Sequence, residues 1–234
     1  MTYFDSRTAF LITGMLYILM PLVVWVALRR EQNSVVKLWC SGGELFGLSL
    51  LLISLRGTVP DWMGFELSSL FMHLGNVQRI QALRTQLGKP LSKPTFVALT
   101  LTFWLVYVAC LWTIPHGPYH FTWTMLAVSF QSLWVYRLAQ QISEKESIES
   151  AKWLGYAYLP LAIFLTLRAI QVVTGQASPG PLINEYTTLL IALMGIVAAV
   201  LGNTSFLAVF VERASRQRIQ MTVDSSAKLS QCSR

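Results

Sequence analysis

The chain has 234 residues, of which 54% are hydrophobic and only 12% are charged, and its mean hydropathy is +0.52. A soluble globular domain carries about 25% charged residues, so this composition excludes a soluble domain that makes up most of the chain. The formal net charge is +7. A basic face beside anionic lipid accounts for that charge, and no nucleic-acid partner is needed to explain it.

Seven apolar stretches are long enough to cross a membrane. A bilayer core needs about 20 apolar residues in a helix, and backbone groups inside lipid have to pair within their own segment. The predicted spans, in chain order, are residues 9–28, 38–55, 63–83, 95–114, 121–138, 153–173 and 186–211. The sequence therefore predicts an all-α integral membrane protein with seven transmembrane helices.

The basic residues predict the orientation of these spans. Arg7, Arg56 and Arg168 fall on one side of the seven spans, and the other fifteen Lys and Arg residues fall on the opposite side. Because Lys and Arg near span ends are retained in the cytoplasm, we expect the N-terminus outside and the C-terminus in the cytoplasm. Arg29 and Arg30 follow the first span directly, so that span is expected to be an anchor and not a cleaved signal peptide.

Several kinds of chemistry find no support in the sequence. No two of the cysteines share an oxidising compartment in this topology, which predicts no disulfide among Cys40, Cys110 and Cys232. Gly117 and Pro118 lie between His116 and His120, and they make this segment a poor helical frame for a metal or haem. We expect no metal, no cofactor and no catalytic residues in this chain.

Polar side chains recur inside the third span at steps of three and four residues, which places them on one stripe of a helix. These residues are Glu66, Ser69, His73 and Asn76. Gln131 of the fifth span lies at a similar depth to His73. Ionisable groups inside a membrane are costly unless they are paired or hydrated, so we expect the stripe and Gln131 to line one polar cavity.

Arg168 of the sixth span is predicted to lie at the depth of Glu66, where an ion pair would offset the desolvation of both groups. Glu185 and Asp61 are alternative partners for Arg168, and a further alternative is that Arg168 extends to the outer interface. The hypothesis is that Glu66, His73, Asn76, Gln131 and Arg168 bind a small ligand or sense protonation.

The seventh span continues from apolar residues into a basic segment without a helix breaker. Phe210 is followed by Val211, Glu212 and Arg213, so we expect one helix to emerge into the cytoplasm, with Phe210, Glu212 and Arg213 relaying a signal. Helix tilt with a basic stop-transfer flank is the alternative. Residues 212–234 are thus interpreted as a signalling-helix stub followed by a disordered tail that begins at residue 224.

Several segments carry a resemblance that covers nearly the whole chain. They are residues 4–8, Trp39 with Gly43 and Gly47, residues 55–62, residues 83–90 and residues 206–213. In order and spacing they resemble the multi-pass N-terminal membrane region of bacterial diguanylate cyclases, and some membrane histidine kinases look alike here. The resemblance implies a bacterial inner-membrane sensor that regulates a cytoplasmic effector, and it makes a homodimer plausible.

The chain departs from that pattern after the last span. No GGDEF-type sequence follows, and no His follows His120, so catalysis by this polypeptide is not expected. Small-residue pairs such as Gly43 with Gly47 and Ala198 with Gly202 are expected to pack helices within the bundle more than between two copies. Two other functions are a small-molecule transporter, which Pro21 and Pro160 within spans would suit, and a membrane scaffold.

Overall fold

The computed structural model describes residues 5–29, 33–113, 118–180, 182 and 186–232, and within them the chain is helical with no β-strand. One π-helical turn, Met63–Leu67, leads directly into α3. The α-helices of the described residues are α1 (Ser6–Ala27), α2 (Ser34–Ser54), α3 (Ser68–Gln86), α4 (Lys93–Thr113), α5 (Tyr119–Glu146), α6 (Glu149–Val173) and α7 (Tyr186–Cys232). The predicted all-α fold is confirmed.

Local sequence signals set the ends of several helices. The side chain of Asp5 accepts a hydrogen bond from the backbone N–H of Arg7 at the start of α1, and Asn33 does the same for Val36 at the start of α2. Such caps satisfy backbone donors that a helix leaves free. Helix α5 ends where Ser147 adopts a left-handed conformation with φ 55°, so only two residues separate α5 from α6.

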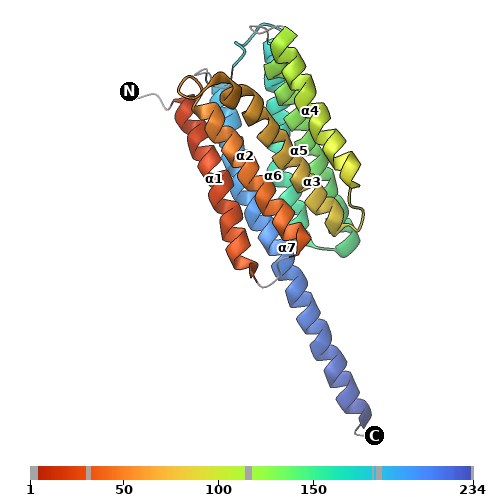
Figure 1. Cartoon of the computed structure of the whole chain (residues 1–234). Helices are drawn as coiled ribbons and strands as arrows, with labels where there is room; N and C mark the ends of the chain where they lie inside the picture. Colours follow the sequence, from red (N-terminus) through yellow and green to blue (C-terminus); the bar gives the residue numbers. More distant parts are fainter. Residues whose placement is uncertain (1–4, 30–32, 114–117, 181, 183–185, 233–234) are drawn as a thin grey trace.

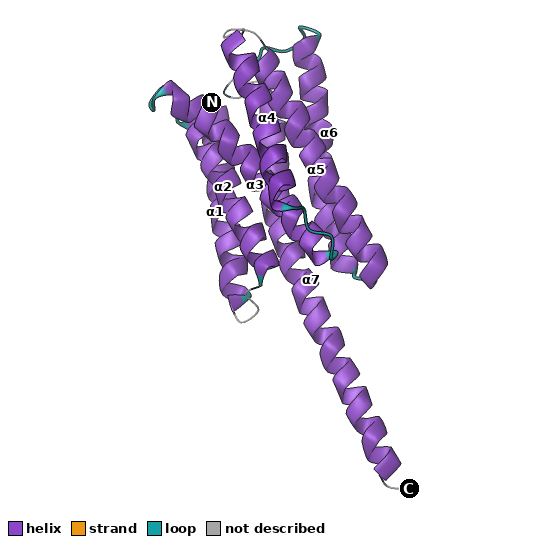
Figure 2. Ribbon diagram, turned by 45° about the vertical axis from the view of Figure 1, so that its right-hand side comes forward, coloured by secondary structure: helices purple, strands orange, loops and turns teal. Residues whose placement is uncertain are grey.

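Six helices form a closed ring, and one lies outside it. Around the ring, neighbours in contact are α1 with α2, α2 with α3, α3 with α5, α5 with α6, α6 with α7, and α7 with α1. Helix α4 contacts α3 and α5; it lies on the right-hand side of the bundle in Figure 1 and comes to the front in Figure 2. We call the end where α1 begins the N-terminal end, and the end where α7 leaves the bundle the exit end (Figure 1).

Five helical segments are long and apolar enough to cross a membrane, which indicates a multi-pass membrane protein. They are Ser6–Ala27, Ser34–Ser54, Lys93–Thr113, Glu149–Val173 and Tyr186–Arg216. Large apolar side chains such as Val26 and Leu105 are exposed on their outer surfaces, as expected of helices that face lipid.

The third and fifth predicted spans are helices, but they are not among these five. Helix α3 can be polar within the bundle because its polar side chains point inward. His73, Asn76 and Arg79 are all buried. A helix between α2, α4 and α5 has little lipid to face. Its low hydropathy therefore reflects contacts with protein, and the helices around it shield its polar groups.

Helix α7 continues well beyond the other helices at the exit end (Figure 1). The segment after residue 224, which was expected to be disordered, is helical up to Cys232. Extending an existing helix by one residue is far easier than starting a new helix, which explains how a polar tail prolongs a packed helix.

Glycines bring three helices into backbone contact. An added Cβ at Gly47 of α2 would lie 2.7 Å from the carbonyl oxygen of Gly14 in α1, and one at Gly75 of α3 would lie 2.5 Å from that of Gly42 in α2. Real Cβ atoms do not approach other atoms that closely. The small residues thus pack helices within the bundle, as the sequence predicted for Gly43 and Gly47.

Replacing Gly47 with Leu is expected to destabilise the protein by about 1–3 kcal/mol or more, because overpacking a close contact forces helices apart. The midpoint of thermal unfolding in detergent measures this loss. Ala98→Leu is the matched control, since Ala98 is exposed on α4. Equal midpoints for the two variants would contradict the close contact between α1 and α2.

Candidate functional site

A cavity of about 80 Å³ lies in the N-terminal half of the bundle. Its wall includes residues from all seven helices, and most of its surface is apolar. The main apolar side chains are Phe10, Phe46, Leu50, Leu161 and Leu165. A void of this size exceeds the roughly 10–15 Å³ that one water molecule needs, so the cavity can accept a small guest.

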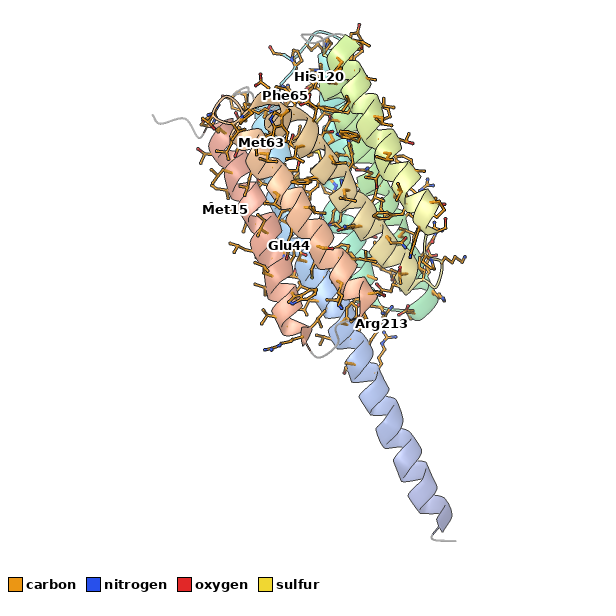
Figure 3. All side chains as sticks on the ribbon, in the orientation of Figure 1. Met15, Glu44, Met63, Phe65, His120 and Arg213 are labelled. Atoms are coloured by element: carbon orange, nitrogen blue, oxygen red, sulfur yellow. The ribbon has the colours of Figure 1, made fainter. Side chains whose placement is uncertain are left out.

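Three polar side chains meet at one end of the cavity: Arg56, Tyr107 and His120. Arg56 directly follows α2, and its Nε donates a hydrogen bond to the carbonyl oxygen of Gly64 at 2.8 Å. Its guanidinium carbon lies 4.1 Å from the centre of the Phe65 ring. Figure 3 places Phe65 and His120 together at the N-terminal end of the bundle. The turn after α2 thereby fixes a cation beside the cavity.

Tyr107 and His120 carry buried polar atoms without a well-aligned hydrogen bond. Tyr107 is only 2% exposed, and its hydroxyl lies close to the Arg56 guanidinium but is poorly aligned with it. The buried Nδ1 of His120 makes no hydrogen bond among the described residues, and the His120 ring meets the Tyr107 ring edge-on at 5.9 Å. Buried polar atoms are nearly always paired in folded proteins, so these two atoms are exceptions that a guest could satisfy.

The opposite end of the cavity adjoins a buried cation. Tyr17 and Phe46 line the cavity, and their ring centres lie 4.8 and 5.6 Å from the guanidinium carbon of Arg79. Arg79 is fully buried, and its three side-chain nitrogens make no well-aligned hydrogen bond among the described residues, although the hydroxyl of Tyr17 lies close to the guanidinium. Contact with aromatic faces attracts a desolvated cation by about 2 kcal/mol or more. Aromatic rings therefore surround Arg79 where a carboxylate would be expected.

Trp39 connects this cation to α7. Its ring centre lies 5.5 Å from the guanidinium carbon of Arg79. The indole Nε1 donates a hydrogen bond to Oδ1 of Asn203 at 3.0 Å, and the ring stacks on Phe206 with centres 4.4 Å apart. Both partners belong to α7, so a continuous set of contacts runs from the cavity to that helix.

His73, Asn76 and Gln131 meet as the sequence predicted. Nδ2 of Asn76 donates to Oε1 of Gln131 at 3.0 Å, and the Gln131 amide also contacts Nδ1 of His73. Phe103 of α4 stacks on the His73 ring with centres 5.5 Å apart. None of the three polar residues borders the cavity. They form a hydrogen-bonded junction between α3 and α5.

The expected ion pair between Glu66 and Arg168 is not formed. Glu66 is half-buried, and its Oε1 accepts a hydrogen bond from Nε1 of Trp112 at 3.4 Å. Arg168 donates to Oγ1 of Thr187 at 2.7 Å and to the carbonyl oxygen of Ser178 at 3.1 Å. Helical rise gives the depth of a residue but not its neighbours, and α3 and α6 are not adjacent in the ring. The alternative partner Glu185 lies outside the described residues.

The predicted relay residues lie where α7 leaves the bundle. Arg213 forms a two-point ion pair with Glu146 at the end of α5, with N···O distances of 2.7 and 2.6 Å. Glu212 accepts hydrogen bonds from the backbone and hydroxyl of Ser150 in α6. Phe210 is buried against Phe206. Figure 3 shows Arg213 at this exit end. These contacts attach α7 to the connection between α5 and α6.

Arg79 is the residue that sequence reasoning missed, because it was counted among the basic residues of a cytoplasmic connection. The signal was present: Arg79 lies three residues after Asn76 and continues the polar stripe of α3. The polar end of the cavity was also missed, since Arg56, Tyr107 and His120 are far apart in sequence. Only the closure of the ring brings them together.

Comparison with known protein families, with curated proteins and with solved structures finds no match for this chain. Within the part of the chain that the structure describes, no three His, Cys, Asp or Glu side chains are grouped so that they could hold a metal ion. Cys40 and Cys110 are free thiols.

A double-mutant cycle on Trp39 and Asn203 tests the contact between α2 and α7. Asn203→Leu leaves a buried indole N–H unpaired and is expected to lower the free energy of unfolding by about 1–3 kcal/mol. Adding Trp39→Phe removes the unpaired donor. The double variant should therefore lose less free energy of unfolding than the two single variants lose together. Strictly additive losses in thermal or denaturant unfolding would show that the two side chains are not coupled.

Proposed function

We propose that this chain is a seven-span sensory module of the bacterial inner membrane that regulates a cytoplasmic effector through α7. A diguanylate cyclase or a histidine kinase is the expected effector. One observation carries the proposal: α7 borders the cavity at Ile191 and Gly195, contacts Trp39 through Asn203, and leaves the bundle at Arg213 as one unbroken helix. A change at the cavity thus has a rigid element on which to act.

The positions of the basic residues support a topology with the N-terminus outside and the exit end in the cytoplasm. Arg7 and Arg56 are joined by a hydrogen bond at the N-terminal end, where the α6–α7 connection that binds Arg168 also lies. Most of the remaining Lys and Arg residues lie near helix ends at the exit end or on the part of α7 beyond the bundle, which is the side that the positive-inside rule assigns to the cytoplasm. Arg79 is an exception because it lies within the bundle.

In this proposal, the bundle has two arrangements that differ in how α7 packs against α1 and α6. A stimulus shifts their populations only if it interacts differently with the two. The rings of Tyr17 and Phe46 face the cavity on one side and Arg79 on the other. Displacing either ring weakens a cation–π contact of Arg79, and Arg79 and Trp39 then repack against α7.

A cyclase domain fused after Arg218 tests whether α7 transmits rotation. Inserting one alanine at the junction turns the output domain by about 100°, whereas inserting about seven residues restores the original phase. We expect cyclic dinucleotide production, normalised to protein level, to follow this periodicity. Production that is independent of the insertion length would overturn transmission by a rotating helix.

The ion pair between Arg213 and Glu146 is expected to set the resting position of α7. Both side chains are about a quarter exposed, and a part-exposed ion pair contributes about 0.5–1 kcal/mol, so Arg213→Ala should change the output of the fused cyclase about two- to five-fold. Arg213→Glu combined with Glu146→Arg should return it toward the original level. Lys152→Ala serves as a charge-removal control, because Lys152 is exposed and has no ion-pair partner among the described residues.

A further inference from the structure

We propose that the cavity binds a small apolar carboxylic acid, with its carboxylate at Arg56 and Tyr107 and its apolar part among Phe10, Phe46 and Leu50. This inference rests on the proposed sensory function and names the class of molecule that is sensed. It starts from the contrast between the two ends of the cavity. One end presents a cation and two buried polar atoms without a well-aligned hydrogen bond, and the rest is almost wholly apolar.

The polar end calls for an anion. No carboxylate of the described residues forms an ion pair with Arg56, and its recorded partners are the carbonyl oxygen of Gly64, the ring of Phe65 and the neighbouring hydroxyl of Tyr107. The guanidinium uses Nε for that carbonyl, and its two other nitrogens form the pair of donors that suits a carboxylate. Glu66, the carboxylate of the neighbouring π-helical turn, is held by the indole of Trp112 and does not border the cavity.

Tyr107 adds a donor to the same end. Its hydroxyl is buried in α4 and lies beside the Arg56 guanidinium, but it makes no well-aligned hydrogen bond among the described residues. An anion bound at Arg56 accepts a hydrogen bond from this hydroxyl as well, and the hydroxyl then gains an aligned partner. Leaving such a group unpaired in a folded protein is costly, so a binding role accounts for its presence in an otherwise apolar wall.

The size and lining of the cavity limit the rest of the ligand. Its volume of about 80 Å³ is near half of the roughly 150 Å³ of an apolar cavity that binds benzene. A ligand with a single ring or a short chain therefore requires only modest movement of the wall. Met72 and Met125 line the cavity, and the flexible methionine side chain adapts readily to a guest.

The experiment uses the full chain in lipid nanodiscs, with benzoate and hexanoate as probes and with benzamide and hexanamide as neutral counterparts. Binding is measured by calorimetry and by the shift in the thermal unfolding midpoint. We expect the acids to bind and the amides to bind at least roughly ten-fold more weakly, as the loss of charge-assisted hydrogen bonds predicts. Amides that bind as tightly as the acids would overturn the proposal, and so would acids that do not bind.

Two substitutions at the polar end locate the carboxylate. Tyr107→Phe removes one poorly aligned hydroxyl, so the ligand-free protein should be at least as stable as before, while affinity for the acids should fall roughly ten- to hundred-fold. Arg56→Gln should weaken binding at least as much, and Arg137→Gln, at an exposed cation far from the cavity, should leave binding unchanged. Unchanged affinity in Tyr107→Phe would contradict the proposed pose even if Arg56→Gln fails to fold.

A third substitution tests whether the ligand lies inside the bundle. Val128→Phe places a ring into the cavity and should abolish binding, whereas Val97→Phe on the exposed face of α4 should not. Acids that still bind to Val128→Phe are on the surface or in the lipid, which would overturn the proposal. These assays need no effector domain. If the acids do not bind, the helix-rotation results for the fused cyclase are unaffected. If the output of the fused cyclase does not depend on the insertion length, the binding results are unaffected.

Discussion

The burial of Arg79 is the constraint on which the central part of the bundle depends. A guanidinium removed from water requires compensation, and here it comes from the rings of Tyr17, Trp39 and Phe46. Those rings come from α1 and α2, and Trp39 in turn contacts α7. One cation therefore fixes the mutual positions of four helices, and apolar packing continues above and below it toward the two ends of the bundle.

The same contacts separate the roles of the two halves. The half toward the N-terminal end is hollow, and its wall is formed largely by adaptable apolar side chains. The half toward the exit end is packed tightly around Trp39, Phe206 and Phe210, and it has an ion pair at its edge. A bundle with a cavity toward one end and tight packing where α7 leaves is the arrangement that the proposed sensory function requires, with α7 moving as a rigid body.

Hydropathy and periodicity predicted the helices and placed His73 and Asn76 on one stripe, because these features depend on local spacing, and the depth of Gln131 in its span matched theirs. Depth did not predict which helices are neighbours, and so it also paired Glu66 with Arg168 across a ring in which α3 and α6 are not adjacent. Charge counting misplaced Arg79 for a related reason. A basic residue near a span end resembles a loop residue unless the aromatic rings that will surround it are known, and these come from distant segments.

The glycine contacts between α1, α2 and α3 have a consequence for how such a sequence can drift over evolutionary time. At Gly42, Gly47 and Gly75 the facing backbone leaves no room for any side chain, and the contact at Gly14 is nearly as tight, so nearly every substitution there costs stability. Helix α4 buries only Thr100, Phe103 and Tyr107, and its other positions need only remain apolar. Related chains should therefore keep very small residues at these glycine positions, while α4 diverges until only its three buried positions and its hydrophobicity remain recognisable.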